Sequence, residues 1–337
     1  MGIPRQRNIL SRYKFSRHLR CLALCLTVLL LNRAPLFAQD YPNRPIRLVV
    51  PTSPGGPYDP VARMIGQKLT EILLQPVVID FKPGATGSIG TDNVAKSAPD
   101  GYSLLFMGTG FAIAPSISAK LPFDPVKDFA AISLLTIGTD VLVANPAVPV
   151  KSVKELLALA RQKPGKLTYA SSGTGGPLHL HAELFKSMAR IDMLHVPYKG
   201  AGPAVVDVIG GHVDLMFVGV PAVLAHIRNA KLRALGVCNL ERFGLLPEVP
   251  TISESGVPGF VASPFSGMLA PAGTSQEVIG KINSALVRIL QTPDMKERLA
   301  TLGIEPKPTT PTQFSAYLQE QIAKWARAVR AAGIKPD

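Results

Sequence analysis

A segment near the middle of the chain combines residue types that bind small anions. It reads LTYASSGTGGPLHLHAELF at 167–185, so a strand-like apolar run passes through serines and glycines into helical spacing. The first N–H groups of a helix have no partner within the helix, and the positive end of its dipole lies behind them. Glycines allow close approach of the backbone, and Ser or Thr hydroxyls add donors. The segment predicts binding of a carboxylate or phosphate by Ser171, Ser172, Gly173, Thr174 and Gly175.

A second segment repeats this order of strand, turn and helix about 120 residues earlier. It reads LVVPTSPGGPYDPVARMIGQKL at 48–69, and its candidate ligand residues are Ser53, Gly55 and Gly56. Asp59 has two interpretations, as the cap of a helix with Pro60 in its first turn or as a ligand contact. Two such units facing one another would form a cleft, because ligands of open α/β sheets bind beyond the carboxyl ends of the strands.

Two shorter glycine-rich turns add Gly84 and Ala85, in FKPGATGSIG at 81–90, and Thr109, in MGTG at 107–110. Such turns also occur in α/β proteins simply to change the direction of the chain, which is the alternative interpretation. None of them continues as Gly-Lys-Ser/Thr or fits G-x-G-x-x-G, so they indicate neither a P-loop nor a dinucleotide site.

His179, His181 and Glu183 raise the possibilities of a metal site and of catalysis. Only His179 and Glu183 share a helical face, and two ligands do not make a metal site. Ser171 and Ser172 beside His179 would suit a Ser/His hydrolase, but the chain lacks a G-x-S-x-G elbow. We therefore expect no metal, no cofactor and no catalytic residue. His179 is expected to reach the anion, with a surface pair between His179 and Glu183 as the alternative.

The first 38 residues resemble a secretory signal peptide. They contain seven basic residues and no acidic one, followed by the apolar run CLALCLTVLLL at 21–31 and by APLFA before Gln39. Eleven apolar residues are too few to span a bilayer, although a retained signal anchor is the alternative. The pattern predicts export from the cytoplasm.

Net charge and cysteine content exclude several classes of function. The chain carries a net charge of +13, and removal of residues 1–38 leaves +6 on 299 residues. The remaining basic residues are scattered, so nucleic acid is not an expected partner, whereas a mild positive balance suits a small anion. Cys238 alone remains after the signal, so no intramolecular disulfide can form, and its apolar neighbours indicate a structural thiol.

Strand-like and helical patterns alternate along the chain, which indicates an α/β protein with mostly parallel sheets. Nine short apolar runs predict strands at 46–50, 77–80, 103–107, 141–144, 167–170, 194–198, 213–218, 233–237 and 266–270. Ser152 and Glu155 form a predicted capping box before a helix. A last helix is predicted from the helical spacing of Phe314, Leu318, Ile322, Trp325 and Val329.

Several motifs together resemble the Bug family, the extracytoplasmic solute receptors of tripartite tricarboxylate transporters. The motifs are YPNRPIRLVVPTSPGGPYDPVAR, PGATGSIGTDNVAKSAPDGYSLL, LPFDPVKDFAAISLL, KSVKELLALARQKPGKLTYASSG, HVPYKGAGPAVVDVIGGHVDLMF, KLRALGV, LPEVPTISESGVPGF and APAGT. They follow one another in order over essentially all of 41–337.

The resemblance implies a type II periplasmic-binding-protein fold, with two α/β lobes joined by two chain crossovers. It places the first lobe at 41–139 plus 265–337 and the second at 140–264. A ligand carboxylate would be held between the turns 53–59 and 171–179, partly through ordered waters. It further implies a monomeric receptor, without enzymatic activity, that serves a membrane permease. An orphan receptor for a signalling partner is the main alternative, and a secreted Ser/His hydrolase is a weaker one.

The chain departs from the family pattern at positions that bear on the ligand. Thr52 stands where an aromatic residue is usual, Val218 and Gly219 stand where Asp-Asn is usual, and Phe265 replaces a common Trp. The second turn carries Gly-Pro-Leu at 176–178 in place of small polar residues. Loss of a carboxylate near the pocket argues against an amino-acid ligand, whose ammonium group would need a partner. We expect a carboxylate with an apolar or aromatic remainder.

Overall fold

The computed structural model describes Gly2 and residues 41–56 and 58–336. By its internal contacts the chain divides into Met1–Asn43 and Arg44–Asp337, and the description below concerns the second unit. Apart from Gly2, the predicted signal peptide, 1–38, lies outside the described residues. Within those residues no helix has the length and apolar character needed to cross a membrane.

The first sheet has six strands in the order β11-β4-β10-β3-β1-β2. Their bounds are β1 (Ile46–Val50), β2 (Val77–Phe81), β3 (Ser103–Gly108), β4 (Phe129–Gly138), β10 (Phe265–Pro271) and β11 (Ile304–Pro306). β1 pairs in parallel with β2 and β3, whereas β10 pairs antiparallel with β3 and β4, and β11 antiparallel with β4. Strands β1 to β4 therefore run one way, and β10 and β11 run the other way.

The second sheet has five strands in the order β7-β6-β8-β5-β9. Their bounds are β5 (Asp140–Ala144), β6 (Thr168–Ser171), β7 (Leu194–Pro197), β8 (Leu215–Gly219) and β9 (Arg233–Val237). Only β5 runs against the others, because it pairs antiparallel with both β8 and β9. Both sheets are thus mixed, although most strands of each share one direction, as the sequence predicts.

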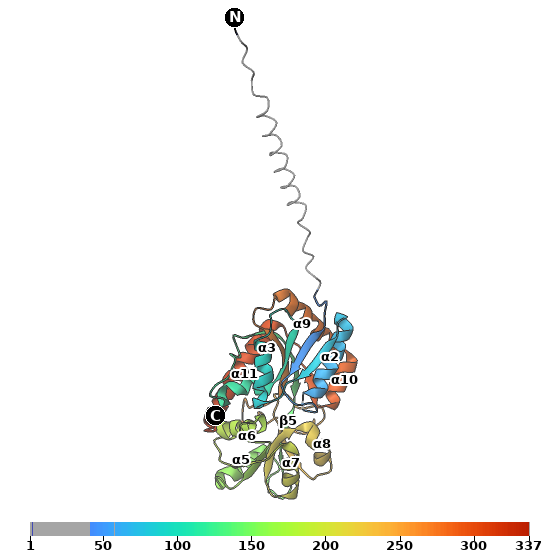
Figure 1. Ribbon diagram of the computed structural model, residues 1–337. Helices are drawn as coiled ribbons and strands as arrows, with labels where there is room; N and C mark the ends of the chain where they lie inside the picture. The colour runs from blue at the N-terminus through green and yellow to red at the C-terminus, as the bar shows by residue number, and fades with distance from the viewer. Residues whose placement is uncertain (1, 3–40, 57, 337) are drawn as a thin grey trace. The chain divides into compact units, whose positions relative to one another are not determined.

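The two sheets belong to two α/β lobes that the chain connects twice (Figure 1). β4 passes directly into β5 through Thr139, and the chain returns from β9 to β10. Hydrogen bonds tie the two crossovers together: Gly138 N–H donates to the Pro264 carbonyl at 2.7 Å, and Asn239 Nδ2 donates to Thr139 Oγ1 at 2.9 Å. The two-lobed fold expected from the sequence is confirmed. The sequence missed two strands, β4 and β11.

The described helices fall into two groups by how their first turns begin. Four begin with a Ser or Thr cap whose hydroxyl accepts a backbone N–H: α5 (Val153–Gln162), α9 (Gln276–Gln291), α10 (Pro293–Thr301) and α11 (Pro311–Ala331). Six have no side-chain cap: α2 (Asp59–Leu73), α3 (Ser88–Ala95), α4 (Thr109–Ile117), α6 (Pro177–Ala189), α7 (Ala201–Gly210) and α8 (Val220–Arg228). A short 3-10 helix, η1 (Ala85–Gly87), precedes α3.

Two predicted caps differ in detail from the structure. Ser152 accepts the Glu155 N–H at 3.2 Å as predicted, but the Glu155 carboxylate accepts the N–H of Lys151 rather than that of Ser152. Asp59 is wrong as a helix cap. Helix α2 has Tyr58 at its N-cap, and Asp59 is its first helical residue.

Helix α11 joins the two lobes, since it packs against α4 and β4 of the first and α6 of the second. Four of the five residues predicted for its apolar face are buried: Phe314, Leu318, Trp325 and Val329. The Trp325 ring stacks on His181 of α6, with 5.3 Å between ring centroids. The predicted structural thiol, Cys238, is free and fully buried at the second crossover, where burial raises its pKa well above the usual value.

Helix α11 packs against both lobes, so the capping box at its N-terminus should contribute measurably to the stability of the fold. Thr310 accepts the Gln313 N–H, and Gln313 accepts the Thr310 N–H in return. We expect Thr310→Ala to lower the free energy of unfolding by about 1 kcal/mol, because it leaves a helix-start donor without a partner. Urea denaturation would measure this loss. Thr310→Ser keeps the hydroxyl and should lose much less, and equal losses would show that the hydroxyl is not the cause.

Candidate functional site

The turn that follows β1 is held by the carboxylate of Asp59. Its Oδ2 accepts the Gly55 N–H at 2.7 Å, and its Oδ1 accepts a bond from Arg63 Nε at 2.5 Å. Gly55 has a φ of +75°, a conformation that side chains rarely adopt. The hydrogen bond from the Gly55 N–H lowers the pKa of Asp59, and the hydrogen bond and charge of Arg63 lower it further. Burial of the carboxyl group opposes this effect. An ionised Asp59 thus shapes this turn and engages a backbone donor that the sequence suggested for the ligand.

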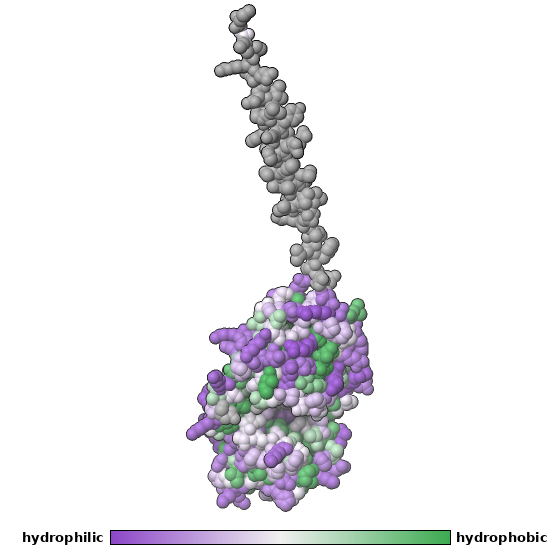
Figure 2. All heavy atoms as spheres, viewed as in Figure 1, coloured by the Kyte–Doolittle hydropathy of each residue, from purple (hydrophilic) through white to green (hydrophobic). Residues whose placement is uncertain are grey.

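A cavity of about 380 Å³ lies beside this turn, where the two lobes meet. Two of the predicted ligand residues line it, Ser53 and Gly84. The other lining residues are Pro51, Thr52, Tyr58, Pro83, Gly87, Ser88, Thr91, Gly108, Gly110, Phe111, Ala114, Phe123 and, from the second lobe, Pro177. Figure 2 shows a hollow in the surface between the lobes. No Lys, Arg, Asp or Glu is among these lining residues, so any charge bound here would meet neutral groups.

Tyr58 is a functional candidate that sequence reasoning missed, whereas Thr52 was noted only as a departure from the family pattern. The Tyr58 ring lies against Phe106 (6.1 Å between centroids), and burial raises the pKa of its hydroxyl to about 12, while hydrogen bonds from Thr109 oppose the rise. Thr52 Oγ1 is buried and has no hydrogen-bond partner among the described residues. The available signal for Tyr58 was its place between Pro57 and Asp59, as the only aromatic residue of the first turn.

Close packing places Tyr58 at the wall of the cavity. A Cβ atom at Gly108 would lie 2.0 Å from Cζ and the hydroxyl oxygen of Tyr58, so only glycine leaves room for the ring. Thr109, a predicted ligand residue, begins α4 next to this contact, and its Oγ1 accepts the Phe265 N–H at 3.0 Å.

The cavity is surrounded by the N-terminal ends of helices that have no side-chain cap. Glycines occupy the N-caps of α3, α4 and α6 (Gly87, Gly108 and Gly176), and the cavity contacts the first residues of all three helices. All six uncapped helices follow strands that run in the main direction of their sheet, whereas the four capped helices do not. The unpaired N–H groups therefore gather at the carboxyl edge of the main strands, where anions are favoured.

The turn that follows β6 is organised by two histidines. Ser171 is fully buried, and its Oγ lies 2.6 Å from Nε2 of His195 on the neighbouring strand β7. His179 Nδ1 accepts the Gly175 N–H at 3.0 Å. The two imidazoles stack with 3.9 Å between centroids. Ser171, Gly175 and His179 thus belong to one hydrogen-bonded turn, in which Gly175 contacts His179 and Ser171 contacts His195.

An acidic and aromatic cluster lies beneath the two histidines. The Tyr169 hydroxyl donates a short hydrogen bond to Glu183, which also accepts from Lys186 Nζ at 2.8 Å. The Tyr169 ring stacks on His195 at 5.0 Å between centroids. Burial lowers the pKa of both histidines, that of His195 to about 4, so both rings are neutral at pH 7. The sequence missed His195, whose only signal was its position in the strand predicted at 194–198.

The remaining predicted ligand residues lie outside the cavity. Gly56 donates its N–H within the first turn to the Ser53 carbonyl at 3.1 Å, and Ala85 is exposed at the start of η1. Ser172, Gly173 and Thr174 form the second turn, in which the Gly200 N–H donates to the Ser172 carbonyl at 3.3 Å. Two more are buried away from the cavity.

Val218 and Phe265 are those two residues. Val218 belongs to β8, where it is 1% exposed and packs in the core of the second lobe. The Phe265 ring contacts Tyr317 edge-on at 5.2 Å between centroids. The sequence analysis considered His181 together with His179, but its side chain contacts Asp140 instead. The distance between His181 Nδ1 and Asp140 Oδ2 is 2.9 Å. Within the described ranges, no three His, Cys, Asp or Glu side chains are grouped as a metal site would require.

The neutral histidine pair predicts a pH dependence of stability. A folded-state pKa below the unfolded value of about 6.5 means that the unfolded chain binds protons first, so stability is present above that pH and is lost as pH falls toward 4. We expect the free energy of unfolding to fall by roughly 1–2 kcal/mol between pH 7 and pH 4.5 through His195, a value reduced because the ring is partly solvated. His195→Gln should flatten this part of the profile in urea denaturation. The exposed His212→Gln should not, and equal slopes for all three proteins would contradict the assignment.

Known proteins resemble this chain over most of its length. Residues 61–334 match the family model described as the tripartite tricarboxylate transporter family receptor. Protein BugT of Bordetella pertussis is 39% identical over 304 residues, which cover 90% of this chain and 93% of BugT.

Solved structures agree in fold. The periplasmic binding protein BugD is 35% identical with a TM-score of 0.71, and the match covers 88% of this chain and all of BugD. An R. palustris protein solved with adipate is 33% identical (TM-score 0.75, 88% and 100% covered). MatC of Rhodopseudomonas palustris, solved with malate, is 32% identical (TM-score 0.70, 86% and 100% covered). This chain belongs to the tripartite tricarboxylate transporter receptors of the Bug type, a family of solute-binding receptors.

Proposed function

We propose that this chain is a periplasmic receptor that captures a small carboxylate between its two lobes and delivers it to a membrane permease. The observation that carries the proposal is the distribution of helix caps. Helix starts at the cleft edge leave their N–H donors without side-chain caps, while the helices elsewhere are capped by Ser152, Ser275, Thr292 and Thr310. Donors of this kind are matched to an anion.

A carboxylate group, which carries a single charge, suits this neutral lining better than a doubly charged phosphate group. Because the lining has no cationic side chain, the charge would be held by N–H groups, by bridging waters and by hydroxyls. The hydroxyl side chains of the lining are those of Thr52, Ser53, Tyr58, Ser88 and Thr91. Adipate and malate are the ligands of two related structures. These relatives support a carboxylate as the class of ligand.

The remainder of the ligand is proposed to be apolar or aromatic. Phe111, Phe123, Ala114 and several prolines form much of the cavity wall. An amino-acid ligand would bring an ammonium group, which needs a carboxylate or several acceptors when buried, and the lining offers no carboxylate.

Capture would proceed by closure of the lobes, which we place at 41–139 plus 265–337 and at 140–264. A carboxylate that touches both turns binds the closed arrangement better and shifts the population toward it by that difference in affinity. The closed form of a monomer would then be recognised by the permease. A signalling partner that reads the same form is the second possibility, and measurement of transport in a permease deletion would separate the two.

A secreted hydrolase has less support. A nucleophilic serine must reach its substrate, and Ser171 is fully buried, with its hydroxyl shared between His195 and Gly173. His179, the base suggested by the sequence, instead accepts a backbone N–H. These contacts favour a structural role for Ser171 within a receptor that has no enzymatic activity.

Ligand-linked stabilisation tests the proposal directly. The chain from Gln39 onward, refolded to remove carried-over ligand, would be screened by thermal shift against mono-, di- and tricarboxylates, aromatic acids, amino acids, sugars and phosphate. A carboxylate at about 100 times its Kd should add roughly 2.7 kcal/mol, a shift of several degrees. We expect benzoate-like acids or plain dicarboxylates to give larger shifts than glutamate or aspartate. A response confined to sugars or phosphate would overturn the proposal.

Substitution of Gly108 tests whether this cavity holds the ligand. Gly108→Ala brings a Cβ against the Tyr58 ring without backbone strain, since the φ of Gly108 is −132°. We expect the affinity for the best carboxylate of the screen to fall at least about tenfold, in isothermal titration calorimetry, because the ring is pushed into the cavity. Gly280→Ala is the matched control, because a Cβ there meets nothing within 4 Å. An unchanged affinity in Gly108→Ala would place the ligand elsewhere.

A further inference from the structure

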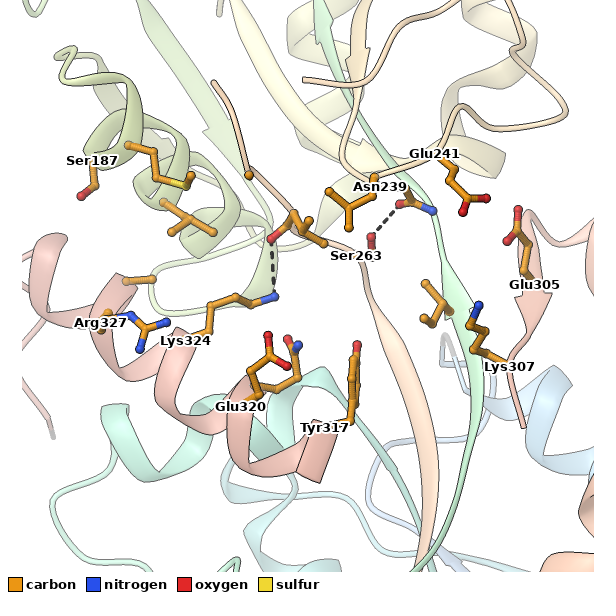
Figure 3. A pocket seen from close by; sticks show the side chains of 18 residues that line it. Ser187, Asn239, Glu241, Ser263, Glu305, Lys307, Tyr317, Glu320, Lys324 and Arg327 are labelled. Atoms are coloured by element: carbon orange, nitrogen blue, oxygen red, sulfur yellow. Dashed lines mark hydrogen bonds between the residues drawn. The ribbon is translucent and has the colours of Figure 1, made fainter. Parts of the chain in front are cut away.

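A second and larger cavity, of about 730 Å³, lies where α11 meets the second lobe and the crossover strands (Figure 3). Its walls come from α6, α11, β11, the segment after β9 and the second crossover. It shares no lining residue with the cavity beside Tyr58. Its volume is typical of a site for a small molecule. We call it the α11 groove.

The charges of the α11 groove divide into a rim and an interior. Five charged side chains are exposed at its rim: Glu241, Glu305, Lys307, Glu320 and Arg327. They include both signs and are solvated. Lys324 is the sixth, and it alone among the charged lining residues is partly buried. The interior of the groove therefore carries one positive charge.

Lys324 lacks a counter-ion. Its Nζ donates a long bond of 3.4 Å to the Val261 carbonyl and lies 4.7 Å from the centre of the Trp325 ring. Among the described residues no carboxylate lies within ion-pair distance of it. Burial lowers its pKa to about 8, against the opposing effect of Glu320. An anion in the groove would stabilise this partly desolvated ammonium group.

A second polar group beside Lys324 also lacks a partner. Gln321 precedes it by three residues on α11, so the two share a helical face. Gln321 is 5% exposed, and its Oε1 is buried with no hydrogen-bond partner among the described residues. A buried carbonyl oxygen requires a donor, which a simple carboxylate does not supply. Tyr317, on the same face, adds a hydroxyl whose pKa burial raises to about 12.

We propose that the α11 groove is a second binding site, for a small hydroxycarboxylate whose carboxylate contacts Lys324 and whose hydroxyl donates to Gln321 Oε1. A hydroxyl suits this position better than an ammonium group, because a second cation beside Lys324 would be repelled. The proposal is independent of the carboxylate proposed for the cavity between the lobes, because the two cavities share no residue.

Lactate and propionate, which differ by one hydroxyl, test the proposal. Binding would be measured by calorimetry in the Gly108→Ala background, in which the cavity between the lobes is obstructed. We expect saturable binding of lactate, binding of propionate at least about tenfold weaker, and a loss of at least about tenfold for lactate when Lys324→Gln is added. Lys296→Gln, an exposed lysine on α10, is the matched control and should change nothing. Absence of lactate binding, equal binding of propionate, or no effect of Lys324→Gln would overturn the proposal.

A second measurement on the wild-type chain covers the case in which Gly108→Ala folds poorly. Lysines would be labelled with ¹³C-methyl groups, and the Lys324 signal identified by its absence in Lys324→Arg. We expect its NMR titration midpoint, near 8 without ligand, to rise when lactate is added, because a bound anion favours the charged form. An unchanged midpoint at saturating lactate would overturn the site. A carboxylate affinity that Gly108→Ala leaves unchanged would instead contradict the cavity between the lobes and would not bear on the α11 groove.

Discussion

Backbone N–H groups without partners are the constraint on which the cleft depends. A strand that runs into a helix leaves the first N–H groups of that helix unsatisfied, and hydroxyl caps satisfy them in α5, α9, α10 and α11. At the cleft edge glycines stand at most of the N-caps instead. These donors must be satisfied by water or by a ligand, and their common direction makes the edge positive without any cationic side chain.

The two turns that the sequence singled out are fixed by different internal bonds. In the first lobe the carboxylate of Asp59 holds the Gly55 N–H, and in the second lobe the imidazole of His179 holds the Gly175 N–H. Each turn therefore uses one of its own donors to set its shape. Such preorganisation lowers the entropic cost of binding, because the loops need not be ordered when the ligand arrives.

Helix α11 connects the two proposed binding regions. It packs on helices of both lobes, and its Tyr317 touches the ring of Phe265, whose N–H bonds to Thr109 at the start of α4. Thr109 in turn hydrogen-bonds to Tyr58, at the wall of the cavity between the lobes. A continuous set of contacts thus runs from that cavity to the α11 groove, across the strands that connect the lobes.

The sequence by itself determined the α/β class, the nine main strands, the last helix and the two glycine-rich turns, because apolar periodicity and Gly or Pro signals are local. It did not determine β4, whose apolar run has no alternation, or which strands run against the rest. Tertiary structure alone decided that Asp59 bonds to Gly55 rather than capping its helix, and that Ser171 meets His195 across paired strands. It also decided that Phe265 faces Tyr317 and that Tyr58 reaches the cavity. Contacts between residues far apart in sequence depend on strand register and helix packing, which no local pattern specifies.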